Sequence, residues 1–174
     1  MAIVTQDMAG FTSGDPRKSF YLRNYEWALK MTFRYIGNYE VAAEAVHDCF
    51  LRLFRSMEQE RWTKAFFIKA AVDGALQGAA QDTIQARARK AQTYLRELAV
   101  PNGEGADPSN YRAVIAQVLL LPLYPRLAYN ICIIEGYTGK EAAGLLGITE
   151  SEVAEHIQIA RTQLKNAMVS IGLK

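Results

Sequence analysis

Hydrophobic residues recur every three to four positions along most of the chain, which is the spacing of one buried face of an α-helix. Two such stretches span residues 17–36 and 39–57. Gly37 predicts the end of the first helix, and Asn38 is a typical N-cap for the second. No stretch alternates convincingly enough to predict a β-strand, so the pattern predicts an all-α protein.

Helical spacing returns in the last third of the chain. A helix is predicted from about residue 114 and interrupted near Pro122 and Pro125, because proline lacks the amide hydrogen that a helix interior needs. Another helix is predicted over residues 126–135. Its predicted inward-facing residues are Leu127, Ile131 and Ile134.

Residues 138–165 predict two helices joined by a tight turn. Thr138 is a natural N-cap, with Glu141 three positions later as in a capping box. Gly147 predicts the end of the first helix, and Thr149 can cap the second. A short turn containing glycine between two such helices indicates a helix-turn-helix, although an αα-corner inside a bundle would have the same pattern. The apolar stripe of the second helix consists of Val153, Ile157, Ala160 and Leu164.

Two prolines and two glycines fall within residues 100–109, a combination that is typical of a linker. We therefore predict two small helical domains joined by a flexible linker. The first would comprise residues 1–99, the linker residues 100–110, and the second domain residues 111–174.

Half of the 174 residues are hydrophobic, which is enough for a real core, and the net charge is only +2. Any contact with nucleic acid must therefore come from local patches rather than from an overall basic field. Cys49 and Cys132 form neither a disulfide framework nor a metal cluster. We expect a cytoplasmic protein, because the N-terminus lacks the features of a signal peptide and no apolar run reaches the roughly 18 residues of a membrane span.

One motif could indicate enzymatic chemistry. Glu44 and His47 form a Glu-x-x-His unit on a predicted helix, as in di-iron proteins. Such a site needs a second copy, and the only other histidine, His156, follows Val153 rather than a glutamate at the corresponding position. We therefore expect no metal site, no cofactor and no catalytic residue, and the chain is not expected to be an enzyme.

Two segments together resemble a known family. Residues 134–153 resemble the promoter-reading C-terminal domain of extracytoplasmic-function sigma factors of bacterial RNA polymerase. Residues 35–54 resemble the region of these proteins that docks on the polymerase clamp helices, including the acidic residue at Asp48 and the Phe50-x-x-x-Phe54 ending. The resemblance covers nearly the whole chain. It implies an alternative sigma factor with core RNA polymerase and promoter DNA as partners, and an anti-sigma factor as a further candidate partner.

The resemblance also implies three sets of site residues. The polymerase-binding set is Asp48, Leu51, Arg52 and Arg55. Residues 62–80 correspond to the family helix that captures the melted −10 element, and residues 81–98 are expected to continue as a helix. The set for the −10 element is Trp62, Lys64, Lys69, Asp73, Arg87, Arg89 and Lys90, with Phe66 and Phe67 as candidate partners of flipped bases. The set for the −35 element is Lys140, Thr149, Ser151, Glu152, Glu155, His156, Arg161 and Lys165.

The chain departs from the family at both DNA-contacting surfaces. Val72 and Asp73 stand where the family usually has an Arg-Asn pair, and residues 149–165 contain three acidic but only two basic residues. A carboxylate repels phosphate, although Glu152 or Glu155 could instead accept a hydrogen bond from cytosine. The alternative hypothesis is therefore a degenerate sigma-like protein that binds polymerase or an anti-sigma partner but no longer reads promoter DNA.

Overall fold

The computed structural model describes residues 15–55, 63–78 and 108–170, and side chains from residue 111 in the last of these ranges. The described residues form helices and short connections without any β-strand, so the predicted all-α fold is confirmed. The helices are α1 (Pro16–Ile36), α2 (Tyr39–Arg55), α3 (Lys64–Gly78), α5 (Pro108–Leu120), α6 (Leu123–Tyr129), α7 (Gly139–Leu146) and α8 (Glu150–Ser170), with one π-helical turn, η3 (Asn130–Ile134).

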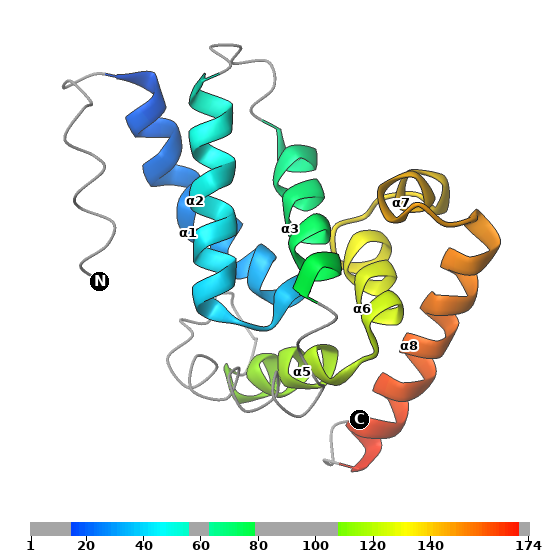
Figure 1. Ribbon diagram of the computed structural model, residues 1–174. Helices are drawn as coiled ribbons and strands as arrows, with labels where there is room; N and C mark the ends of the chain where they lie inside the picture. Colours follow the sequence, from blue (N-terminus) through cyan, green and yellow to red (C-terminus); the bar gives the residue numbers. More distant parts are fainter. Residues whose placement is uncertain (1–14, 56–62, 79–107, 171–174) are drawn as a thin grey trace.

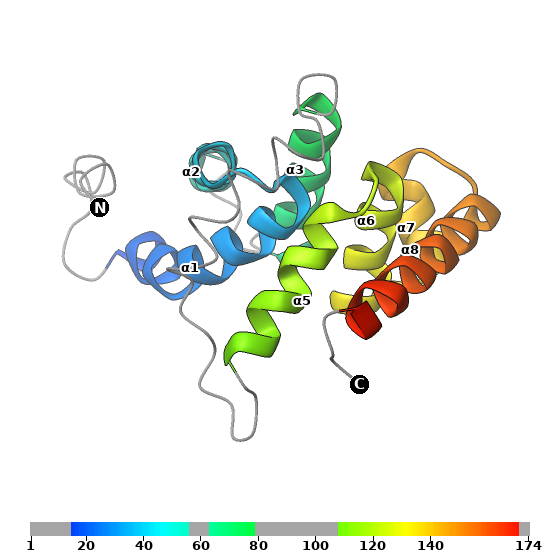
Figure 2. The ribbon, with the colours of Figure 1, turned by 90° about the horizontal axis from the view of Figure 1, so that it is seen from below.

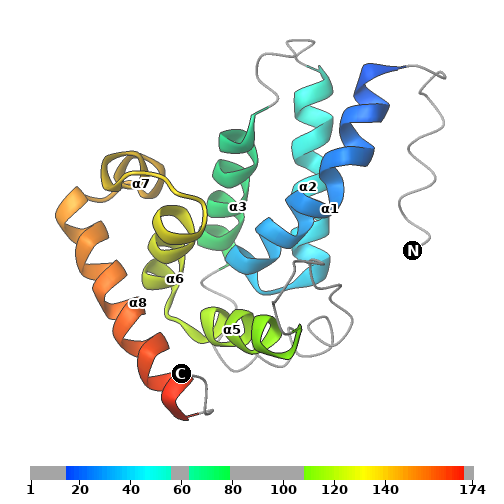
Figure 3. The same cartoon turned by 180° about the vertical axis from the view of Figure 1, so that it is seen from behind.

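The helices form two groups that lie side by side (Figure 1). Helices α1, α2 and α3 all pack on one another and are called the N-terminal half below. Helices α5 to α8, with η3, are called the C-terminal half, in which α8 packs along α6 and α7. Helix α3 lies between α1 and α2 on one side and α6 and α7 on the other, as the view from behind also shows (Figure 3).

Local signals set the boundaries of the first two helices as the sequence predicts. The carboxylate of Asp15 accepts a hydrogen bond from the amide of Arg17 at 2.8 Å and caps α1. Gly37 ends α1 with a φ of 76°, a left-handed conformation that glycine adopts without steric cost. The side chain of Asn38 accepts from the amide of Glu40 at 3.1 Å, which confirms the predicted cap of α2.

Phe50 lies at the centre of the N-terminal half. Its ring is 1% exposed and packs within 4.8 Å of the Tyr21 ring and 4.9 Å of the Phe67 ring, measured between centroids. The rings of Phe54 and Phe20 lie at 5.7 and 6.0 Å. Aromatic side chains bury a large area each, so this cluster joins α1, α2 and α3 into one unit.

The apolar core continues from the N-terminal half into the C-terminal half. Buried residues of α5 and α6, including Ile115, Leu119 and Leu127, belong to the same cluster as Phe50. Helix α5 contacts α1 and lies at an angle to it (Figure 2). Residues 108–110 of the predicted linker form the start of α5, so the linker prediction is wrong there. The rest of the linker and the helix expected over residues 81–98 lie outside the described residues, so the division into two domains stays a prediction.

Two details of the C-terminal half differ from the sequence prediction. Helix α6 begins at Leu123 and contains Pro125 in its first turn, where a missing amide hydrogen costs no helical hydrogen bond. Ile134 is 39% exposed, so its predicted inward orientation is wrong, whereas Leu127 and Ile131 are buried. The cause is the π-helical turn, whose extra residue rotates the side chains that follow it.

No helix in the described part of the chain combines the length and the hydrophobicity needed to cross a membrane.

Candidate docking groove and helix-turn-helix

The outer face of α2 carries the four residues assigned to polymerase binding. Asp48, Leu51, Arg52 and Arg55 are all exposed, and Leu51 is 37% exposed. The opposite face of the same helix is fully buried, because its apolar residues pack on α1 and α3. The helical spacing therefore brings the four residues together into one ridge, which we call the α2 ridge.

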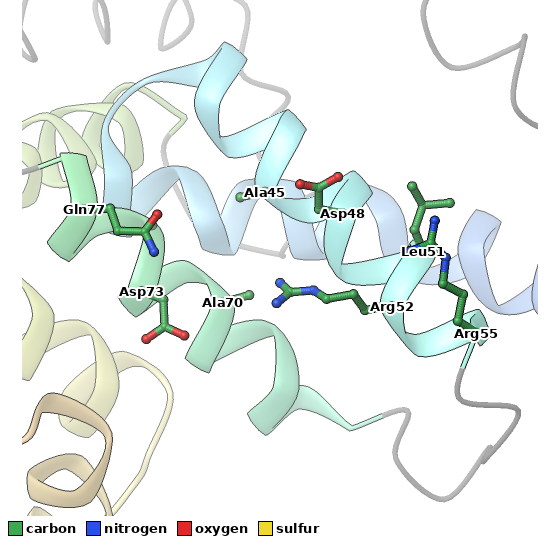
Figure 4. A pocket seen from close by; sticks show the side chains of 9 residues that line it. Ala45, Asp48, Leu51, Arg52, Arg55, Ala70, Asp73 and Gln77 are labelled. Atoms are coloured by element: carbon green, nitrogen blue, oxygen red, sulfur yellow. The ribbon is translucent and has the colours of Figure 1, made fainter.

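The α2 ridge lines one side of an open groove of about 480 Å³ between α2 and α3 (Figure 4). On the other side lie Asp73 and Gln77 of α3. The Arg52 side chain extends from α2 across the groove toward α3, and its guanidinium lies 5.8 Å from the centre of the Phe66 ring. A second, more apolar hollow of about 540 Å³ shares Arg52 and Asp73 and reaches Leu145 of α7.

The candidate DNA-contacting residues of α3 differ in their exposure and in the residues that they contact. The ammonium of Lys69 lies 3.4 Å from the carboxylate of Asp73, one helical turn away, and both side chains are largely exposed. Phe66 is partly buried beside Arg52. Phe67 is only 2% exposed, so its predicted contact with a flipped base is wrong: its ring fills the core against Phe50.

We predict that Asp73→Asn increases the affinity for single-stranded DNA by a few fold. The substitution removes a negative charge and releases Lys69 to pair with a phosphate. Fluorescence titration with a labelled single strand of a −10 sequence measures this, and Asp73→Ala is the matched variant that removes the charge without supplying an amide. Unchanged affinity in both variants would contradict this account of α3.

Lys64, the other described cation on α3, forms an ion pair with the C-terminal half. Its ammonium lies 2.7 Å from the carboxylate of Glu135, which also pairs with the guanidinium of Arg34. The Glu135 side chain is only 3% exposed. The sequence analysis missed this residue because its inward orientation depends on the π-helical turn directly before it. No periodic pattern signals such a turn.

Helices α7 and α8 form a turn with two capping boxes. The Glu141 carboxylate accepts from the Thr138 amide at 2.8 Å, and the Glu152 carboxylate accepts from the Thr149 amide at 2.7 Å. Gly147 ends α7 with a φ of 68°. The predicted caps and turn are therefore confirmed, and they fix the direction in which α8 leaves the turn.

The predicted stripe of α8 faces inward. Val153, Ala160 and Leu164 are buried against α5, α6 and α7, while Ile157 is partly buried. Most residues assigned to the −35 element are consequently exposed on the other faces of the motif. They are Lys140, Thr149, Ser151, Glu152, Glu155, Arg161 and Lys165.

Three residues of the −35 set, Thr149, Glu152 and His156, are also engaged within the protein. The ring of His156 stacks on the ring of Tyr124 in α6, with centroids 5.4 Å apart. The Oε2 atom of Glu152 accepts from both the amide and the hydroxyl of Thr149. These contacts position α8 on α6 and at the turn, and only Oε1 of Glu152 is left for another donor.

The remaining site predictions concern residues outside the described ranges and the candidate metal-binding motif of Glu44 and His47. Trp62, Arg87, Arg89 and Lys90 lie outside the described residues. Within the described ranges, no three His, Cys, Asp or Glu side chains lie close enough together to hold a metal ion, and this includes the surroundings of Glu44 and His47.

No protein-family model matches this chain, and no curated protein matches it.

We predict that the two capping boxes make the helix-turn-helix sensitive to acid. Hydrogen bonds from Thr138 and Thr149 lower the pKa of Glu141 and Glu152 below their ordinary value of 4.5. Because the folded-state pKa is depressed, the stabilisation is fully present above that value and is lost as the pH falls below it.

Thermal unfolding followed by circular dichroism at about pH 7 and about pH 3 measures this effect. The double variant Glu141→Gln/Glu152→Gln should show a smaller drop in Tm between the two values than the wild type. Glu155→Gln removes an exposed acid of α8 outside both boxes and should leave the drop unchanged. An equal drop in all three proteins would contradict the prediction.

Proposed function

We propose that this protein is an alternative sigma factor that binds core RNA polymerase and directs it to promoters. The observation that carries the proposal is the α2 ridge: four residues at family-like positions are exposed together beside an open groove, on a helix whose opposite face is fully buried. Apolar and charged side chains mixed around such a groove are typical of a protein-binding surface. In the proposed role, Leu51 makes the apolar contact, and Asp48, Arg52 and Arg55 set the orientation of the partner.

The helix-turn-helix supports the promoter-reading part of the proposal. Two capping boxes hold α7 and α8 rigidly, and α8 exposes a row of side chains that can donate to or accept from base edges. Lys140, Arg161 and Lys165 are the exposed cations available to contact phosphates. Phosphate contacts supply much of a protein's affinity for DNA. Because the helix-turn-helix has only these three cations, we expect it to bind promoter DNA weakly and to depend on core polymerase for stable binding.

A second candidate function is a sigma-like protein that binds polymerase or an anti-sigma factor without reading promoters. The contacts of the described cations on α3 favour it. Lys64 pairs with Glu135 and Lys69 lies beside Asp73, so a phosphate would have to compete with a carboxylate of the same chain at each of them. In this alternative the α2 ridge has the same role and only the DNA surfaces differ.

Run-off transcription with purified core polymerase tests the proposal and separates the two candidates. A sigma factor should give transcripts of defined length from a subset of promoter fragments. Binding to polymerase without any transcript would support the second candidate. Absence of both binding and transcripts would contradict the sigma factor and would leave an anti-sigma factor as the partner in the second candidate.

A further inference from the structure

The two halves of the protein meet at an ion-pair cluster formed by Arg34 of α1, Lys64 of α3 and Glu135 after η3, in which the Glu135 side chain is buried and the Lys64 side chain is 43% exposed. We call it the Glu135 triad. The carboxylate of Glu135 bridges the two cations, and the Lys64 ammonium also lies 3.4 Å from the backbone carbonyl of the same residue. A single acidic residue of the C-terminal half thus neutralises one cation on each of two helices of the N-terminal half.

We propose that the Glu135 triad is an autoinhibitory contact that holds the two halves together and keeps Lys64 away from nucleic-acid phosphates. The inference rests on the proposed function, which assigns Lys64 to the −10 strand. In the closed arrangement the nearest anion to Lys64 is a carboxylate of the same chain. A phosphate therefore has to compete with a partner that is already in place at 2.7 Å.

The polar groups around the triad are incompletely satisfied, which indicates a contact that can open. Within the described residues, the Nε atom of Arg34, the hydroxyl of Tyr35 and the Oδ1 atom of Asn130 are buried and have no hydrogen-bond partner. Each such atom lowers the stability of the closed arrangement, because water would satisfy it once the halves separate. The Tyr35 side chain is fully buried, and burial together with the nearby Glu135 charge raises the pKa of its hydroxyl.

The packing between the halves is also sparser than the packing within them. Helix α1 contacts α5, and α3 contacts α6 and α7, but α1, α2 and α3 pack on one another far more extensively. The apolar core is nevertheless continuous across the interface, so separation of the halves has to expose part of it to water. The apolar contacts of Ile115 and Leu119 favour the closed arrangement, and the triad adds charge pairing that a competing polyanion can replace.

The test is the Glu135→Gln variant of the full-length chain, measured in two ways. Small-angle X-ray scattering should show a larger radius of gyration than the wild type. Fluorescence anisotropy with fluorescein-labelled oligothymidine should show about three- to tenfold tighter binding, and the slope of log affinity against log salt should steepen by about 0.7, the value for one added phosphate contact on a single strand.

Three further variants make the result specific. Glu44→Gln removes the same charge from an exposed position of α2 and should leave both the dimensions and the slope unchanged. Glu135→Gln/Lys64→Met should be as extended as Glu135→Gln but should lose the gain in DNA affinity. Glu135→Asp keeps the negative charge but shortens the side chain by one methylene, which weakens its reach to the two cations, so it should fold and give an intermediate gain even where Glu135→Gln unfolds.

Scattering and anisotropy keep this inference separate from the proposed function. Unchanged dimensions in Glu135→Gln and Glu135→Asp would overturn the inference whatever the polymerase assays show. Increased dimensions without tighter DNA binding would also overturn it, because Lys64 would then not be the group that is held back. Absence of polymerase binding by the wild type would count against the proposed function instead, since the α2 ridge is exposed in the closed arrangement.

Discussion

Phe50→Ala should lower the free energy of unfolding by about 3–5 kcal/mol, the usual cost of deleting a buried phenyl ring. The ring is 1% exposed and touches aromatic side chains from all three helices of the N-terminal half. Its removal leaves a cavity that α1, α2 and α3 must collapse together to fill. We expect a loss of this size to leave the N-terminal half partly unfolded near physiological temperature.

Chemical denaturation followed by circular dichroism measures the effect of Phe50→Ala. The matched control is Leu51→Ala, one residue further along α2 but on the exposed ridge, which should change stability by no more than about 0.5 kcal/mol. Similar losses in the two variants would contradict the assignment of the buried and exposed faces of α2.

Leu51→Asp should weaken binding to core RNA polymerase by at least about tenfold while leaving Tm nearly unchanged. Leu51 is the apolar residue of the α2 ridge, and a carboxylate there would stand beside Asp48 in the groove and have to be desolvated against the partner. Truncating or charging a central apolar contact commonly costs more than 1.4 kcal/mol of binding energy, which is one factor of ten.

Leu22→Asp provides the matched control for that measurement. Leu22 is 62% exposed on α1 and does not line the groove, so the variant has the same change in charge and hydrophobicity at a different surface. Equal affinity of the wild type, Leu51→Asp and Leu22→Asp in a fluorescence titration would show that the α2 ridge is not the docking surface. A large drop in Tm for Leu51→Asp would instead indicate a structural role.

Local rules explain why so much of the fold could be predicted from the sequence. Gly37, Gly147 and Thr138 end or begin helices through interactions within four residues, so their roles are visible in the chain itself. The stripes of α2 and α8 likewise follow from the helical period. The same period separates the α2 ridge from the core, so the sequence predicts that its four residues share one exposed face, whereas their assignment to polymerase binding follows from the family resemblance.

Features that depend on tertiary contacts could not be predicted in this way. The π-helical turn at Asn130–Ile134 changes the direction in which the side chains of Ile134 and Glu135 point, and nothing in the amino-acid composition predicts such a turn. Phe67 belongs to an aromatic residue pair on α3, and only the position of α2 decides which ring is buried. Lys64 has the chemistry of a phosphate ligand, but its pairing with Glu135 links residues 71 positions apart.

The affinity of the purified wild-type chain for purified core RNA polymerase tests the central claim most directly. We predict saturable one-to-one binding that Leu51→Asp weakens at least about tenfold and that Leu22→Asp leaves intact. Absence of saturable binding by the folded wild-type chain would contradict the account.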